Sequence, residues 1–180
     1  MKRSAVISYS KESRFFHWFI AVVLIFMLSG SFFLGDLPEQ YVSSGFIIHK
    51  SIGLTILFLM VLRLIWILHS GKPPLPTSVA PWEKYLSRIV QYSLYACGIL
   101  MPLSGWIMST AADKAPVYFG LFSIPFPGIG PNEPLSHLMN TAHKTIAWIF
   151  ISLIVLHVLG ALKHHFIDKD NVLQRMLSGR

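Results

Sequence analysis

The chain has 180 residues, of which 53% are hydrophobic and only 13% are charged. An ordinary soluble domain is excluded as the first interpretation, because soluble domains are less apolar and carry more charge. The net charge of +7 does not indicate a nucleic-acid partner, since the basic residues gather at the ends of apolar segments, where lysine and arginine meet lipid headgroups. Length and composition therefore predict a single domain, residues 1–180, embedded in a lipid bilayer.

Four apolar stretches are each long enough to cross a bilayer as a helix, which needs about 20 residues. Basic residues precede the first stretch, as in a signal peptide, but no convincing small-x-small cleavage site follows, so we expect a retained helix. The single cysteine, Cys97, excludes an intrachain disulfide and covalent c-type haem. The predicted helices cover residues 15–35, 46–68, 86–110 and 137–166, with Ala142–Phe166 as the apolar part of the last.

The segments between these stretches predict how the helices are connected. Residues 36–45 form a short acidic connector, and residues 69–84 are too rich in proline to be helical throughout. The long loop, residues 111–136, is apolar enough to predict an ordered cap, whereas residues 167–180 form a polar tail. Basic residues concentrate on the side of both termini, so the positive-inside rule places both termini in the cytoplasm. The predicted fold is an all-α, integral membrane four-helix bundle running up, down, up, down.

Histidines in these helices fall at matched depths. His143 and His157 are fourteen residues apart in the last helix, which places them within about 40° on one face and about 21 Å apart along the axis. In the predicted topology His49 begins the second helix at the depth of His143, and His17 begins the first at the depth of His157. The four residues therefore predict two pairs, His49 with His143 near the outer face and His17 with His157 near the inner face.

Such pairs are suited to bind two b haems. Each haem needs two facing axial imidazoles and an apolar slot for the macrocycle. Structural zinc is the competing interpretation, but it prefers four ligands at one depth, often with thiolates. Small residues that would let a ring approach lie one to four positions from the histidines: Ser51, Gly53, Ala142, Ala147, Gly160 and Ala161.

Haem propionates would need cations near the membrane surfaces. Arg14 and Arg63 suit the inner haem, although Arg63 is equally compatible with a residue whose head snorkels to the surface. Lys50 and Lys144, each directly after an outer histidine, suit the outer haem. The third helix has no histidine, contains Pro102 and is interpreted as a scaffold. The remaining membrane-end histidines are interpreted as polar groups satisfied by neighbours or headgroups: His69, His137, His164 and His165.

Several segments resemble the bacterial cytochrome b561 family of small four-helix, di-haem membrane cytochromes. The resemblance covers nearly the whole chain, and its most specific part is the run that follows the last membrane histidine. The matching segments are RFFHW, HKSIG with VLRL, WEKYLSR, MPLSGW, STAADKAPVYFGLFSIP, AHKT and VLHVLGALKHHFIDKDNVLQRM. Carried over position by position, the resemblance implies that His17, His49, His143 and His157 are the axial ligands of two b haems. Relatives often have a histidine where this chain has Gln91, which affects any quinone contact or proton transfer there.

The resemblance also implies a location and partners. Family members exchange electrons with the ubiquinone pool in the bacterial inner membrane, and superoxide oxidation is assigned within the family. An electron would pass between a donor on the outer side, superoxide among the candidates, and ubiquinone in a lateral pocket. Lys50, Lys144 and Lys114 would either steer an anion toward the outer haem or only neutralise propionates. The chain is expected to be a monomer or homodimer.

Two other functions stay open on the sequence alone. A haem-bearing anchor subunit of a larger dehydrogenase or hydrogenase would share the four-helix plan, and it predicts co-purification with a peripheral subunit. A channel or transporter that uses histidines for metal or protons predicts no visible absorbance. Two axial imidazoles saturate iron, so among redox functions they favour electron transfer over oxygen binding.

Overall fold

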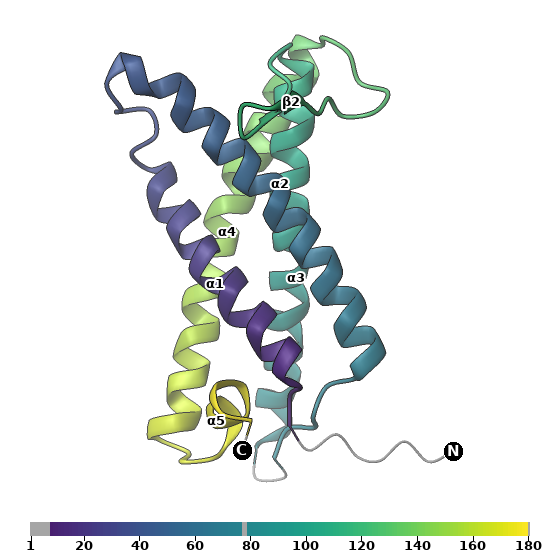
Figure 1. Cartoon of the computed structure of the whole chain (residues 1–180). Coiled ribbons are helices and arrows are strands. Elements are labelled where there is room, and N and C mark those ends of the chain that lie inside the picture. Colours follow the sequence, from purple (N-terminus) through teal and green to yellow (C-terminus); the bar gives the residue numbers. More distant parts are fainter. Residues whose placement is uncertain (1–7, 77–78, 180) are drawn as a thin grey trace.

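The computed structural model describes residues 8–76 and 79–179. Four long helices dominate this part of the chain, and Figure 1 shows consecutive helices running in opposite directions. Each is long and apolar enough to cross a membrane, so the predicted all-α four-helix bundle is confirmed. The helices are α1 (Lys11–Ser31), α2 (Glu39–Ser70), α3 (Pro81–Ala111) and α4 (Glu133–Phe166); a hairpin of β1 (Val117–Tyr118) and β2 (Phe122–Ser123) and a short helix, α5 (Val172–Leu177), complete the fold.

The helices begin earlier than the apolar pattern predicts. The first helix was expected at 15–35 but spans 11–31, because the Ser10 hydroxyl accepts a hydrogen bond from the Ser13 amide and caps the polar first turn. The second and third begin seven and five residues before the predicted 46 and 86. Pro81 opens α3, a position where proline loses no helix hydrogen bond.

The fourth helix shows the same correction and shortens the long loop. It starts at Glu133 rather than 137, because the Asn132 side chain accepts a hydrogen bond from the Leu135 amide. His143 therefore lies ten residues inside α4, and His49 ten residues inside α2, rather than at helix starts. Polar capping turns are part of the helices although hydropathy assigns them to connectors.

The helices do not pack evenly around the bundle. The α4 backbone lies along α3, α3 contacts α2, and α2 contacts α1, whereas α4 makes few close backbone approaches to α1 or α2. A small core joins α1 to α2 through Ile20, Ile56 and Met60. The side of α4 that faces α1 and α2 is therefore reached by side chains rather than by close backbone packing.

The hairpin is fixed to α2. The Ser51 hydroxyl is fully buried, donates to the Ile47 carbonyl and accepts the Phe119 amide at 2.8 Å. The Thr55 and Tyr118 hydroxyls lie 3.0 Å apart. The loop is the ordered cap that the sequence predicts. We call this part of the molecule the hairpin end.

The polar tail folds back on the opposite end, which we call the α5 end (Figure 1). Arg14 donates to the Leu177 carbonyl and Trp18 to the Met176 carbonyl, so α1 holds the last turn of α5. Arg175 donates to the Pro74 carbonyl in the connector after α2. The tail is thus a docked element rather than only a solvated extension.

Candidate functional site

The four predicted histidines meet in the predicted pairs. The rings of His17 on α1 and His157 on α4 have centroids 6.2 Å apart, with planes at 68°. The rings of His49 on α2 and His143 on α4 have centroids 6.5 Å apart, with planes at 70°. All four side chains are half-buried. One pair lies toward each end of the bundle, and α4 contributes to both.

Helix α3 contributes no histidine but holds one of them. His143 Nδ1 lies 2.9 Å from the Met101 carbonyl oxygen and 3.1 Å from the Ser104 hydroxyl. The Ser104 hydroxyl is buried and itself donates to the Met101 carbonyl at 2.7 Å. Because a carbonyl only accepts, Nδ1 carries the proton, and Nε2 is the nitrogen left with a free lone pair.

Gly105 makes this approach possible. A Cβ at this position would lie 3.1 Å from His143 Cε1 and 3.2 Å from Nδ1, closer than ordinary van der Waals contact. Gly98, seven residues earlier on α3, instead accommodates the end of the Met60 side chain. Small residues on α3 thus let it approach α4 at Gly105 and α2 at Gly98.

The pair at the α5 end lies beside a buried cation. Arg63 is 8% exposed and its head is held among protein groups. It donates to the Tyr95 hydroxyl and to the carbonyl of Ser13, one turn before His17 on α1. Lys72 lies over the Tyr95 ring as well, and burial together with the charge of Arg63 lowers the pKa of the Lys72 ammonium. The α5 end therefore presents concentrated positive charge.

A phenylalanine occupies α4 midway between the two pairs. Phe150 is seven residues from both His143 and His157, which places the three side chains along one face of the helix. It is 2% exposed, and it is the one residue of α4 that is fully buried. Phe150 is not among the predicted site residues, although its seven-residue spacing from both histidines can be seen in the sequence.

The other predicted site residues have different surroundings. Arg14 donates through Nη1 to the Leu177 carbonyl, and its Nε is buried without a partner among the described residues. Lys50 is half-buried and donates to the Lys114 carbonyl at 2.8 Å, so it links α2 to the loop. Lys144 is exposed. Gln91, on α3, donates to the Ser87 hydroxyl.

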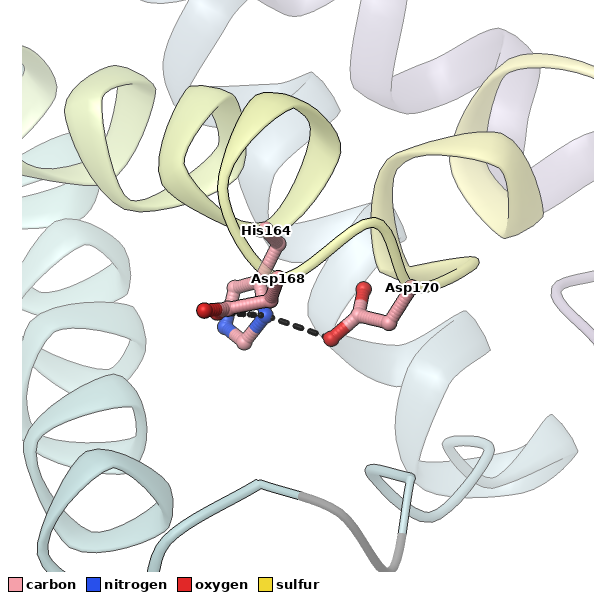
Figure 2. Close-up of side chains that lie close together, drawn as sticks. All are labelled: His164, Asp168 and Asp170. Carbon is pink, nitrogen blue, oxygen red and sulfur yellow. Dashed lines mark hydrogen bonds and ion pairs between the residues drawn. The ribbon is translucent and has the colours of Figure 1, made fainter.

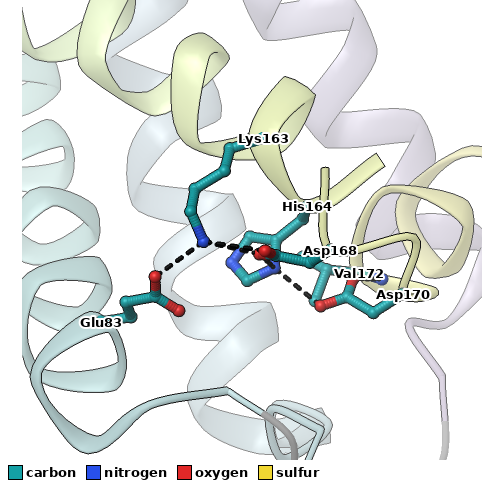
Figure 3. A network of polar contacts seen from close by, with 6 residues as sticks. All are labelled: Glu83, Lys163, His164, Asp168, Asp170 and Val172. Atoms are coloured by element: carbon teal, nitrogen blue, oxygen red, sulfur yellow. Dashed lines mark hydrogen bonds and ion pairs between the residues drawn. The ribbon is translucent and has the colours of Figure 1, made fainter. Parts of the chain in front are cut away.

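A polar cluster follows α4 at the α5 end. Figure 2 shows His164 facing Asp168 and Asp170, and its Nδ1 lies 2.7 Å from an Asp170 oxygen. Figure 3 shows that Lys163 bridges Asp168 to Glu83 of α3, at 2.7 Å from each. The second Asp170 oxygen accepts the amide of Val172, the first residue of α5.

The polar groups of this cluster therefore have hydrogen-bond and ion-pair partners within the chain. A histidine and two carboxylates at this spacing also meet the geometric requirement for a metal ion. However, an ammonium already neutralises Asp168, and a helix start already binds Asp170. His164 behaves as the sequence predicts, as a polar group satisfied by a neighbour. His137 is similar, because it lies 3.6 Å from Glu133 in an exposed pair.

Comparison with known proteins identifies the family. The model of the family described as prokaryotic cytochrome b561 matches residues 8–179. The chain belongs to the prokaryotic cytochrome b561 family. As a family member with four membrane-capable helices, it is a multi-pass bacterial membrane protein of electron transport, and the family implies a haem b cofactor.

Three curated relatives support the assignment. Cytochrome b561 homolog 2 of Escherichia coli (strain K12) is 33% identical over 172 residues, which are 94% of this chain and 90% of the relative. The probable superoxide oxidase CybB of Yersinia pestis is 29% identical over 161 residues, 89% of this chain and 90% of the relative. Cytochrome b561 homolog 1 of Escherichia coli (strain K12) is 27% identical over 176 residues, 96% of this chain and 98% of the relative.

The histidine pairs fit the cofactor that the family implies. When a metal lies between two imidazoles, two bonds of about 2 Å and the two ring radii put the ring centres about 6 Å apart. Both observed separations agree with this value. A Cβ at Gly53, one turn after His49, or at Gly160, one turn after His157, would meet no other atom within 4 Å. Each pair thus has a glycine with open space next to it one turn after one of its histidines.

Proposed function

We propose that the chain binds two b haems, one between His49 and His143 and the other between His17 and His157. The observation that carries the proposal is the pair of imidazole separations, 6.5 and 6.2 Å, at opposite ends of the bundle. A b haem with two axial imidazoles supplies one-electron transfer without an open coordination position. Consequently, the chain's own residues would hold the two haems, set the distance between them and place charged groups beside them.

The orientation follows from charge. We place the α5 end in the cytoplasm, because most of the lysine and arginine residues, 11 of 15, lie in the segments on that side. These segments are the sequence up to Arg14, the connector after α2 with the first turns of α3, and the end of α4 with the tail. The His17–His157 pair is then the inner pair and the His49–His143 pair the outer pair. The membrane is the bacterial inner membrane, and the single domain covers residues 1–180.

At the inner pair, arginines would bind the propionates. Arg63 is buried beside Ser13 and Tyr95, and the Arg14 Nε–H is a buried donor without a partner among the described residues. Buried donors of this kind gain free energy from an anionic acceptor. At the outer pair, Lys50 and Lys144 are the corresponding cations, with Lys144 exposed at the surface.

The proposed reaction joins an outer donor to ubiquinone. Superoxide is the donor we propose, because a relative of 29% identity is named a probable superoxide oxidase. The electron would leave from the inner site to ubiquinone. His17, His49, His143 and His157 would hold the two haems, and a haem held by two imidazoles would supply electron transfer rather than oxygen binding.

The hairpin end does not favour long-range steering of an anion. The helix ends and connectors on this side contain three lysines, Lys50, Lys114 and Lys144, and also four carboxylates, Asp36, Glu39, Asp113 and Glu133. We therefore expect these lysines to act locally on propionates, and the rate of superoxide consumption to change little between low and high ionic strength.

Purified protein tests the function directly. Superoxide should be consumed with stoichiometric reduction of added ubiquinone, and a reduced-minus-oxidised spectrum should show a b-type haem. A spectrum without haem would contradict the proposal and favour a channel or transporter. A haem spectrum with ubiquinone reduced only in the presence of a co-purified subunit would contradict the free-standing enzyme and favour the anchor-subunit alternative.

A further inference from the structure

We propose that helix α3 positions the outer ligand His143 through Met101, Ser104 and Gly105, and thereby gives the outer haem a lower reduction potential than the inner haem. The inference deepens the proposed function and rests on it, because it concerns the two haem sites. It assigns a role to a helix that supplies no ligand and that the sequence predicts to be only a scaffold.

The first step is the hydrogen bond at Nδ1. The Met101 carbonyl lies 2.9 Å from His143 Nδ1, within the range of a well-formed hydrogen bond. The bond fixes one tautomer, and it leaves Nε2 as the donor atom toward the partner ring of His49. A carbonyl that accepts the Nδ1 proton also makes the imidazole a more basic ligand.

The second step is the geometry that holds this bond. The Ser104 hydroxyl bonds the same carbonyl at 2.7 Å and lies 3.1 Å from Nδ1, so two oxygens of α3 face the ring nitrogen. Gly105 supplies the space, because a Cβ there would come within 3.2 Å of Nδ1. A side chain at position 105 would therefore push the ring away by a few tenths of an ångström.

The third step is the difference between the two pairs. Among the described residues, a hydrogen bond to a ring nitrogen of a paired histidine is found only for His143. A more basic axial ligand donates more electron density and stabilises oxidised iron, which lowers the potential. At the inner pair the buried cation Arg63 acts in the opposite sense, since positive charge stabilises the reduced metal.

The test is a spectroelectrochemical titration of the purified full-length holoprotein. The His157→Ala variant, which would keep only the outer haem, assigns that haem's potential in the wild type. We expect the outer component to have the lower potential. An outer component with an equal or higher potential would overturn the inference.

Two alanine substitutions on the same helix test the mechanism. Gly105→Ala pushes the His143 ring away from Met101, so the outer potential should rise, or the haem content should fall by the outer haem alone. Gly98→Ala is the matched control, because its Cβ would meet the Met60 side chain of α2 and not a histidine, so both potentials should stay unchanged. An unchanged outer haem in Gly105→Ala, or an equal shift in both variants, would contradict the role of α3.

Serine variants provide a second readout that disturbs packing less. Ser104→Ala should raise the outer potential by less than Gly105→Ala, whereas Ser104→Thr, which keeps the hydroxyl, should restore the wild-type value. A shift confined to the inner component would overturn the inference. Failure of the proposed function can be told apart from failure of this inference alone. If the proposed function is wrong, wild-type protein holds fewer than two haems, and the inference is then wrong as well.

Discussion

The two histidine pairs have nearly the same ring geometry but different surroundings. At the hairpin end, His143 is held by a backbone carbonyl and a hydroxyl of α3, and His49 lies on the helix to which the loop is fixed. At the α5 end, His17 and His157 lie beside the buried Arg63, beneath a tail that docks on α1. The comparison shows that two similar histidine pairs have different neighbours, hydrogen-bonding groups at one and a buried charge at the other, and we expect these to tune the two proposed sites separately.

Removing one ligand of each pair has the largest expected effect and tests whether the pairs are independent. His143→Ala should remove the outer haem and leave the inner one, and His157→Ala should do the reverse, because each iron would lose one of its two axial bonds. Haem content per chain after purification measures the loss. If both variants lose both haems while the protein remains folded, the pairs do not act as separate sites.

Truncating Phe150, the buried residue between the two histidine pairs, should lower the stability of the bundle. Phe150→Ala removes a fully buried ring, so the free energy of unfolding should fall by about 3–5 kcal/mol. Phe150→Leu is the matched control and should cost about 1.5 kcal/mol or less. Unfolding followed in detergent measures both. A Phe150→Ala protein as stable as the wild type would show that burial of this ring does not stabilise the bundle.

Neutralising the buried cation should lower the inner potential, a shift opposite in sign to the rise that the α3 variants cause at the outer haem. Arg63→Gln keeps a polar side chain but removes the charge, so the potential of the inner haem should fall while that of the outer haem is unchanged. Arg63→Lys, which keeps the charge, should stay near the wild type. Redox titration provides the measurement, and a shift of the outer haem alone would reverse our assignment of Arg63.

The polar cluster after α4 should have the smallest effect on the haem sites. Asp170→Ala removes the bond to His164 and the bond to the first amide of α5, which should lower stability by about 1–2 kcal/mol. Both haems should remain bound with unchanged potentials. Loss of the inner haem in this variant would show that docking of α5 supports the inner site directly.

The sequence predicts those features that depend on periodicity and hydropathy. Four apolar stretches are enough to derive the bundle, and the up-and-down order brings His49 to His143 and His17 to His157. This agreement arises because a helix can cross the membrane in only two directions, so the order of the helices fixes the depth of each histidine. Histidines at the same depth are the ones that can meet.

The features that the sequence does not predict depend on contacts between distant segments. Hydropathy places the starts of α2 and α4 too late, because their capping turns are polar. The hydrogen bond between His143 and α3 uses the Met101 carbonyl, and a backbone carbonyl leaves no mark in the sequence. The small residues in MPLSGW do indicate a close helix contact. Docking of α5 depends on Arg14 and Trp18 reaching carbonyls more than 150 residues away.

The number of haems per chain tests the central claim most directly. Protein purified in a mild detergent, with haem quantified as its pyridine complex and protein by amino-acid analysis, should contain two b haems for each chain. A ratio of one, or the absence of haem from folded protein, would contradict the account.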